Sequence, residues 1–349
     1  MSEAFMRPVR PDDFDEILAL AKLSGGGMTN LPPEPDALRS RVDFTCRSFE
    51  ANATEPGGEV YMMVLEKDGK VLGTSAVFSA VGLDHGFVNY RINKTVHAST
   101  QLRKRVERRL LVPTHDFTGC SEVGSLFLSP DARGGGYGKY LARARYLFIA
   151  QHRDILADPV CAELRGWRGP NGEQPFWEAL GKPFFDMEFE AADVANSAMG
   201  NQIIADMMPR HPIYVALLPK EARDILGRPH EGAVPAYNML LKEGFQFRGY
   251  IDVFDGGPLV DAPIDEIETV KASRVYKVAS LADPGAAPLM LMAAGRLSTF
   301  RALRAPAKVD GDSMIISEGS AKALGVAAGD EVRAVEWCPP PSASQTPPP

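Results

Sequence analysis

The sequence feature that most constrains the fold is a short apolar run followed by a glycine-rich turn and an amphipathic pattern. Residues 122–128 predict a buried strand, and residues 133–138 read Arg-Gly-Gly-Gly-Tyr-Gly. From Lys139 onward, apolar residues recur with helical spacing, which predicts a helix ending near His152. Glycines let backbone N–H groups approach an anion, and a helix N-terminus favours negative charge. The unit therefore predicts a cradle for a diphosphate group.

Two common phosphate-binding motifs do not fit this turn. A Walker A loop needs Gly-Lys followed by Ser or Thr, and the dinucleotide fingerprint would need glycine where the chain has Lys139. The order Arg133, Gly136, Gly138 instead resembles the R/Q-x-x-G-x-G/A loop of the GNAT acyltransferase superfamily. A glycine-rich turn without a ligand is the alternative, and the strand directly before the turn favours the acyltransferase interpretation.

The rest of the chain predicts a mixture of helices and strands. Periodicity and turn signals predict helices over residues 11–23 and 35–50, a hairpin over 59–78 with its turn at Asp68-Gly69, and a strand over 160–164. Residues 175–189 and 235–254 each read as a helix followed by an aromatic-rich strand, here 184–189 and 245–254. This faint repeat indicates two copies of one half-fold, with two unrelated units as the alternative.

A break at residues 255–258 precedes a change of pattern. Short strands are predicted over residues 274–280, 289–294, 313–317 and 331–337, with a small helix over 320–324. These elements indicate a β-rich C-terminal module. The proline-rich end, residues 339–349, has almost no apolar content and is predicted to be a disordered tail.

Composition excludes several classes of protein. Of 349 residues, 45% are hydrophobic and the formal net charge is −7, which excludes a disordered chain and argues against general nucleic-acid binding. The basic run 103–109 is interpreted as an exposed helix face, with RNA binding as the weaker alternative. No apolar run spans a bilayer and no secretory signal is visible, so we expect a cytoplasmic protein without a membrane partner. The cysteines have no metal-ligand spacing, so we expect reduced thiols and no metal: Cys46, Cys120, Cys161, Cys338.

Short sequence segments distributed over the chain resemble the arginine/ornithine succinyltransferase family of the GNAT superfamily. They extend from about residue 6 to residue 260, with a weaker likeness near residues 329–332, and comprise residues 7–10, 24–32, 90–91, 96–99, 115–119, 175–177, 180–182, 208–214 and 250–258. The resemblance implies an α+β fold in which tandem GNAT-like halves, with mixed sheets flanked by helices, precede the small β-rich module. We divide the chain at residues 1–190, 191–262, 263–338 and 339–349, the second part carrying the candidate catalytic histidine.

The resemblance also implies chemistry and site residues. It implies transfer of succinyl from succinyl-CoA to the α-amino group of L-arginine, or of L-ornithine in some members, by a homo- or hetero-oligomer. The CoA thioester is expected to contact Leu126 and the loop residues Arg133, Gly134, Gly136 and Gly138. His230 is expected to be the catalytic proton donor.

Residue chemistry alone leaves the site more open. The chain has six histidines, and this chemistry does not choose among them. His97 and His115 are the runners-up, and His152 is interpreted as satisfying a helix C-terminus. Arg91 and Arg210 are candidates for binding carboxylates; for the guanidinium group, Asp252 or Asp255 are candidates.

Three alternatives to the leading interpretation remain open. The fold would also suit another acyl donor or amine, such as acetyl-CoA or ornithine. It would equally suit a non-catalytic partner subunit that stabilises an active paralogue. An RNA-associated protein is the third and weakest alternative.

Overall fold

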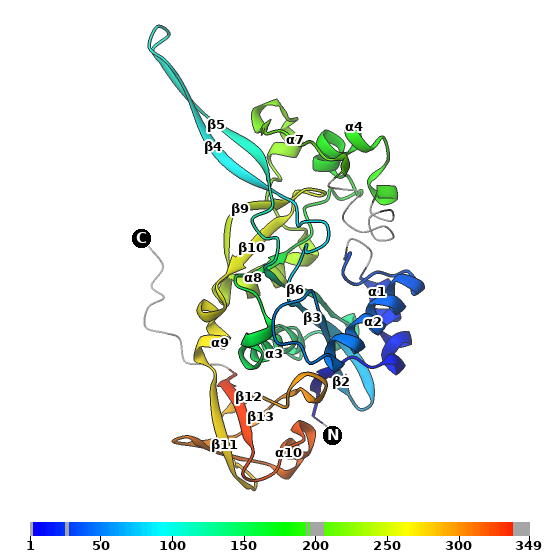
Figure 1. Cartoon of the computed structure of the whole chain (residues 1–349), viewed down its shortest axis with the longest axis vertical. Helices are drawn as coiled ribbons and strands as arrows, with labels where there is room; N and C mark the ends of the chain where they lie inside the picture. Colours follow the sequence, from blue (N-terminus) through cyan, green and yellow to red (C-terminus); the bar gives the residue numbers. More distant parts are fainter. Residues whose placement is uncertain (1–2, 25–27, 193–194, 196–205, 338–349) are drawn as a thin grey trace.

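The computed structural model describes residues 3–24, 28–192, 195 and 206–337. Within these residues, sixteen strands form one continuous, strongly curved sheet (Figure 1) in the order β14-β15-β11-β16-β12-β13-β1-β2-β3-β6-β7-β10-β9-β4-β5-β8. The strands of the first part are β1 Phe5–Pro8, β2 Val60–Lys67, β3 Lys70–Phe78, β6 Ser121–Leu128 and β7 Val160–Glu163. Its helices are α1 Phe14–Leu23, α2 Pro35–Glu50 and α3 Tyr137–Gln151.

Strand β2 is buried on both faces because helices cover both sides of the sheet. Alternate residues Tyr61, Met63 and Leu65 belong to the core beneath α3, whereas Val60, Met62 and Val64 face α1 and α2. A continuous apolar run is the pattern expected of such a doubly covered strand. The predicted hairpin of β2 and β3 is confirmed, with Asp68 and Gly69 at positive φ in its turn.

The sheet continues through β10 and β9 into a second layered region. Here β7 pairs with β10, β10 with β9, and β9 with β4. The strands are β4 Asn89–Ser99, β5 Lys104–Thr114, β8 Ile213–Tyr214, β9 Gln246–Asp252 and β10 Pro258–Ala262. The accompanying helical segments are the π-helix Trp177–Gly181, α4 Lys182–Phe185, α7 Lys220–Arg223 and α8 Val234–Lys242.

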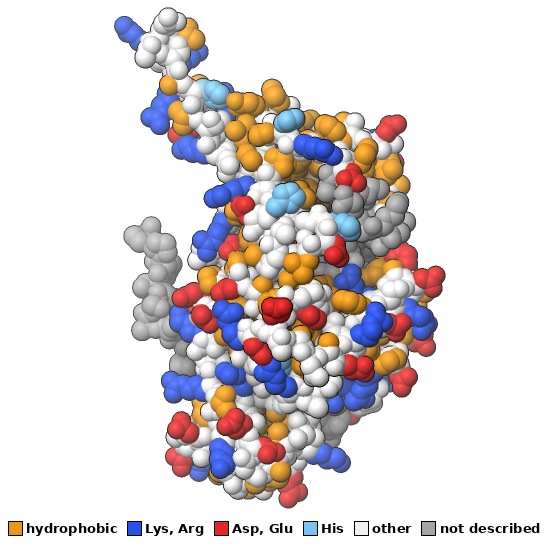
Figure 2. Space-filling model, viewed as in Figure 1, with side chains coloured by type: hydrophobic (Ala, Val, Ile, Leu, Met, Phe, Trp, Pro, Cys, Tyr) orange, Lys and Arg blue, Asp and Glu red, His pale blue; other side chains and the backbone are white. Residues whose placement is uncertain are grey.

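Two sequence predictions in this region are wrong. The expected strand over residues 184–189 is not formed: Phe184 and Phe185 lie in α4, so the two halves of the faint repeat differ. The basic run 103–109 is not a helix face, because β5 begins at Lys104 and pairs with β4 along its whole length. Figure 1 shows these two strands as a long hairpin that projects from the body, and Figure 2 shows Lys and Arg side chains gathered on it.

The β-rich C-terminal module shares its core with α3. Its strands are β11 Arg274–Leu281, β12 Leu289–Ala294, β13 Arg301–Pro306, β14 Lys308–Asp310, β15 Ser313–Ile316 and β16 Glu331–Glu336, and its helices are α9 Glu268–Ala272 before them and α10 Glu318–Leu324. The four predicted strands are confirmed, and β13 and β14 are additional. Strand β13 pairs with β1, which joins the module to the rest of the sheet. The predicted disordered tail, residues 339–349, lies outside the described residues, and the domain division stays a prediction.

Candidate active site

The centre of the candidate site is a point where two parallel strands separate. Strands β6 and β7 pair only through Ser121 with Val160 and Glu122 with Cys161. Beyond Glu122, β6 keeps its antiparallel neighbour β3 on one side and diverges from β7 on the other. Beyond Glu122, the edge of β6 on the diverging side is therefore not paired with β7.

A β-bulge lies on β6 at this point. Ser125 has φ of 48°, and the register with β3 shifts between Thr74 and Ala76. Bulges re-aim backbone and side-chain groups next to active sites. Leu126 follows the bulge directly, and its side chain is partly buried against the core beneath α3. The Leu126 side chain therefore belongs to the core. We expect the backbone of Leu126, and not its side chain, to contact the thioester.

The segment before α2 holds the bulge in place. Ser125 donates from its backbone N–H to Asn30 Oδ1 (3.3 Å) and from Oγ to the Asn30 carbonyl oxygen (2.9 Å). Gly124 is required here, because a Cβ on it would lie 2.4 Å from Asn30 Nδ2. Residues Gly25 to Gly27, which belong to the family-like segment 24–32, lie outside the described residues.

His230 reaches the same neighbourhood from a distant part of the sequence. Its backbone N–H donates to the carbonyl oxygen of Arg165 (2.8 Å), two residues beyond the end of β7. The guanidinium of Arg165 donates to the carbonyl oxygen of Ser24 (3.4 Å), at the start of the segment that reaches Asn30. His230 is therefore held at the chain that follows β7, past the point where β7 leaves β6.

The His230 imidazole is half-buried and held in one orientation. Its Nδ1 accepts a hydrogen bond from the Gly232 N–H (3.0 Å), so the neutral ring carries its proton on Nε2. Burial lowers the pKa of His230 from 6.5, and the charges of Arg165 and Arg168 lower it further. The ring is thus a neutral hydrogen-bond donor near neutral pH.

The glycine-rich turn forms the N-terminus of α3. Gly134 and Gly136 have φ of 96° and 75°, and Gly136 is the N-cap residue. A side chain on Gly138 would meet nothing within 4 Å, so the first turn of α3 is open to a ligand. Arg133 is exposed next to it. The turn therefore has the form expected of an anion cradle.

The other candidate histidines and arginines belong to the β4–β5 hairpin and to the chain beside it. His97 lies on the projecting hairpin, its ring 5.7 Å from that of Tyr214, and His115 is exposed in the loop after β5. Arg91 is exposed, with its guanidinium 4.0 Å from Asp116. Arg210 is exposed as well.

His152 caps the end of α3, but not as a cation. Its Nδ1 lies 2.8 Å from the Phe148 carbonyl oxygen and its Nε2 accepts from the Leu297 N–H (3.0 Å), so the ring links α3 to the C-terminal module. Burial lowers the pKa of His152 to about 4. The interpretation that His152 satisfies the C-terminus of this helix is confirmed, and the ring does so in its neutral form.

The two aspartates proposed for the guanidinium group serve the backbone. Asp252 accepts from the N–H groups of Phe254 and Asp255 (2.7 Å each). Asp255 accepts from Gly166 (2.6 Å) and Gly257 (2.8 Å), which fastens the turn after β9 to the strand that leads to His230. Both side chains therefore fix the backbone of the turn after β9.

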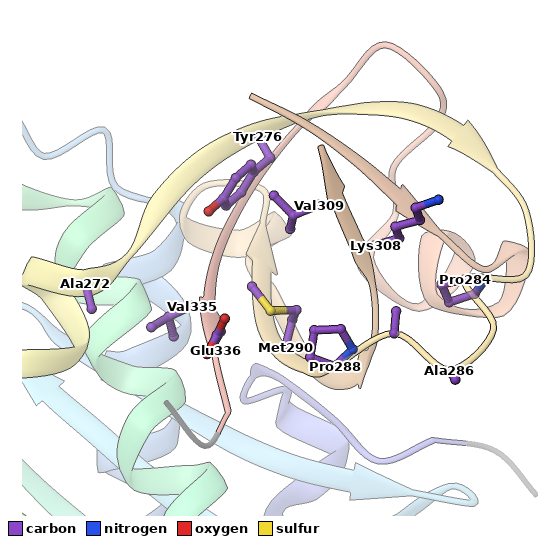
Figure 3. A pocket seen from close by; sticks show the side chains of 11 residues that line it. Ala272, Tyr276, Pro284, Ala286, Pro288, Met290, Lys308, Val309, Val335 and Glu336 are labelled. Carbon is purple, nitrogen blue, oxygen red and sulfur yellow. The ribbon is translucent and has the colours of Figure 1, made fainter. Parts of the chain in front are cut away.

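A separate hollow of about 720 Å³ lies in the C-terminal module. Figure 3 shows Tyr276, Met290, Pro288 and Val309 around it, and no residue of the β6–His230 neighbourhood lines it. Among the residues that the structure describes, no group of histidine, cysteine and acidic side chains is placed to hold a metal ion, and no helix is long and apolar enough to cross a membrane.

A bulged strand that parts from its parallel neighbour beside a glycine-rich helix start is the arrangement that the sequence resemblance implied for an acyltransferase. Comparison with known proteins is more specific. The family model described as arginine N-succinyltransferase beta subunit matches residues 4–269, and the model of that subunit's C-terminal domain matches residues 274–336. The chain belongs to the arginine N-succinyltransferase family, which confirms the predicted family and fold class.

Individual relatives cover nearly the whole chain. The arginine N-succinyltransferase subunit beta of Pseudomonas aeruginosa is 40% identical over 333 residues, 95% of this chain and 97% of the relative. The arginine N-succinyltransferase of Citrobacter koseri is 38% identical over 338 residues, with the same shares. The solved structure of arginine/ornithine succinyltransferase subunit AI from Pseudomonas aeruginosa has a TM-score of 0.87 and 33% identity, and the match covers 96% of this chain and 99% of that chain.

Proposed function

We propose that this chain is an arginine N-succinyltransferase that transfers the succinyl group of succinyl-CoA to the α-amino group of L-arginine. Relatives that carry this name match the chain over nearly its full length. The structural observation that carries the proposal is the position of His230: its N–H donates to the carbonyl oxygen of Arg165, two residues beyond β7, where β7 has left the bulged strand β6. This position supports a role for His230 at the place where β6 and β7 separate.

The residues have distinct roles in this proposal. The α3 turn, with Arg133, Gly134, Gly136 and Gly138, holds the CoA diphosphate through its N–H groups. The backbone next to Leu126 faces the thioester carbonyl. The amine nitrogen forms a bond to the carbonyl carbon, and the carbon–sulfur bond breaks to release CoA.

His230 assists the step in which charge develops. Its neutral ring presents Nε2–H, which donates to the developing oxygen or sulfur anion. The proton lost by the amine ends on the departing CoA thiolate, so no net proton is left on the protein. A neutral imidazole that acts as donor is consistent with the lowered pKa of His230.

Assembly and location complete the proposal. The family description and the solved relative both speak of subunits, so the chain is proposed to work as a homo- or hetero-oligomer in the cytoplasm. Light scattering on the purified protein tests this assembly. A monomer that turns over substrate would contradict it.

A mass-spectrometric product assay tests the reaction. The purified protein is mixed with succinyl-CoA or acetyl-CoA and with L-arginine or L-ornithine. Ornithine is included because the solved relative is described as an arginine/ornithine succinyltransferase. N-succinylarginine should be the main product. No product from any pair, together with retained CoA binding, would instead support the non-catalytic subunit.

A further inference from the structure

Beyond the groups assigned above, a half-buried carboxyl group stands at the end of β7. Glu163 is the last residue of the strand, past the point where β7 leaves β6. Its carboxylate accepts a hydrogen bond from Asn89 Nδ2 (2.7 Å). It lies two residues before Arg165, whose carbonyl oxygen holds His230. Glu163 is therefore on the strand that carries the candidate site.

The surroundings of Glu163 are acidic. Burial raises the pKa of Glu163, and the charges of Asp252, Glu122 and Asp255 raise it further. None of these dominant contributions comes from a cation. Asp252 and Asp255 are already engaged by backbone N–H groups, whereas the Glu163 carboxylate faces an amide side chain. The neighbourhood would gain from a positive charge brought by a ligand.

Asn89 supplies an independent sign of a missing donor. Its side chain is fully buried, yet its Oδ1 has no hydrogen-bond partner among the described residues. The Nδ2 of the same amide group contacts Glu163. A buried oxygen without a partner is costly in a folded protein. The Asn89 amide oxygen can therefore accept a hydrogen bond from an N–H donor brought next to Glu163.

We propose that Glu163 and Asn89 form the subsite that receives the guanidinium group of the amino-acid acceptor, an inference that rests on the function proposed above. A guanidinium is always charged and offers five N–H donors in a planar fork. Two carboxylate oxygens of Glu163 and the Asn89 Oδ1 are the acceptors that match this fork. Glu163 lies two residues before Arg165, whose carbonyl oxygen accepts from the His230 N–H, so the subsite is on the same stretch of chain that holds the candidate catalytic ring.

L-Citrulline gives a direct test, because it replaces the guanidinium with a neutral group of similar shape. Wild-type protein should use L-arginine at least 100-fold better than L-citrulline in kcat/KM. The Glu163→Gln variant should lose about 50-fold or more for arginine, mainly through KM, and less than 3-fold for citrulline. Its KM for succinyl-CoA should be unchanged.

Two further variants keep the test independent of folding. Glu231→Gln removes an exposed carboxylate beside His230 and should change the arginine-to-citrulline ratio by less than 3-fold. Glu163→Asp keeps the charge and should retain a preference for arginine. Burial and nearby like charges make an ionised Glu163 carboxylate unfavourable in the ligand-free protein. Ligand-free Glu163→Gln should therefore unfold at no lower temperature than the wild type. A purely structural role of Glu163 predicts a lower unfolding temperature for this variant.

The outcomes separate the subsite from the reaction. Equal losses for arginine and citrulline in Glu163→Gln, or no loss for either, would overturn the subsite even if the wild type makes N-succinylarginine. A wild-type protein that makes no product is tested by calorimetry with L-arginine and L-citrulline. Arginine-selective binding that Glu163→Gln abolishes would support the subsite while the proposed reaction fails, and binding without that selectivity would overturn the subsite.

Discussion

At the scale of single residues, the orientation of one imidazole decides what His230 does. The Gly232 N–H occupies Nδ1, so only Nε2 is left to meet a substrate. Burial and the two nearby arginines favour the uncharged ring. Protonation at Nδ1 would break the bond from Gly232, so the held orientation and the neutral state depend on each other.

The His230 pKa can be measured directly. Because burial, Arg165 and Arg168 all disfavour the charged ring, its NMR titration should give a pKa below 6.5, and the ring should stay neutral at every higher pH. The signal is assigned by its loss in His230→Gln. In Arg168→Gln one nearby cation is gone, so the His230 pKa should rise. A pKa above 6.5 in the wild type would contradict the neutral-donor role.

At the scale of elements, the start of α3 depends on glycines that do different things. Gly136 is the N-cap residue at φ of 75°, a conformation that costs other residues about 1–2 kcal/mol. Its Cβ would also lie 3.0 Å from the Arg304 guanidinium. Gly138 lies one residue inside the helix with open space around it. One glycine is needed for the turn, and the other leaves room in front of the helix.

Alanine at each position separates these roles. Gly136→Ala should lower the free energy of unfolding by about 1 kcal/mol or more, because its backbone is strained. Gly138→Ala should be neutral or slightly stabilising, since alanine favours a helix. With CoA added, however, the rise in melting temperature should be smaller for Gly138→Ala than for the wild type, because the new methyl group occupies phosphate space. An undiminished CoA effect in Gly138→Ala would argue against the cradle.

At the scale of the whole molecule, the C-terminal module and α3 share one core. Trp337 and Ala302 of the module pack in the same cluster as Tyr140 of α3. The Tyr140 hydroxyl donates to the Ala302 carbonyl oxygen (2.7 Å), and Arg143 Nη1 donates to the Trp337 carbonyl oxygen (2.6 Å). The module therefore supports the helix whose N-terminus forms the candidate CoA cradle.

A shared core predicts cooperative unfolding. Differential scanning calorimetry should show one transition for the full chain, because opening the module would expose α3 and the β1 edge together. Trp337→Ala should lower that single transition by several degrees, with a large-to-small cost of about 3–5 kcal/mol. Two resolved transitions in the wild type would mean that the module is an independent domain.

Local signals in the sequence predicted the local units of this fold. The β2–β3 hairpin, the strand–turn–helix unit of β6 and α3, and four C-terminal strands all have their signal within a few residues. The β4–β5 hairpin was missed because few of its side chains are buried, so its strands lack the alternation of a half-buried sheet. Strand β10 was not predicted because it begins at Pro258, within the Gly-Gly-Pro sequence that was interpreted as a break.

The assembled site was less predictable than its parts. Family resemblance pointed to Leu126, the α3 turn and His230, and these assignments stay predictions. Glu163 had no local signal, since it is one acidic residue at the end of a four-residue strand. Its meeting with Asn89 depends on the curvature of a sheet whose pairing order no local pattern specifies. Short sequence segments thus indicate candidate residues, whereas the long-range pairing of strands determines which of these residues come into contact.

The most direct test of the central claim compares His230 with a control histidine in one assay. Formation of N-succinylarginine from succinyl-CoA and L-arginine is measured for the wild type, His230→Gln and His115→Gln. The account predicts that His230→Gln loses about 100-fold or more in kcat, as expected when a donor to a developing anion is removed, with the KM for succinyl-CoA nearly unchanged. His115→Gln should stay within 3-fold of the wild type. A His230→Gln enzyme with wild-type kcat would contradict the account.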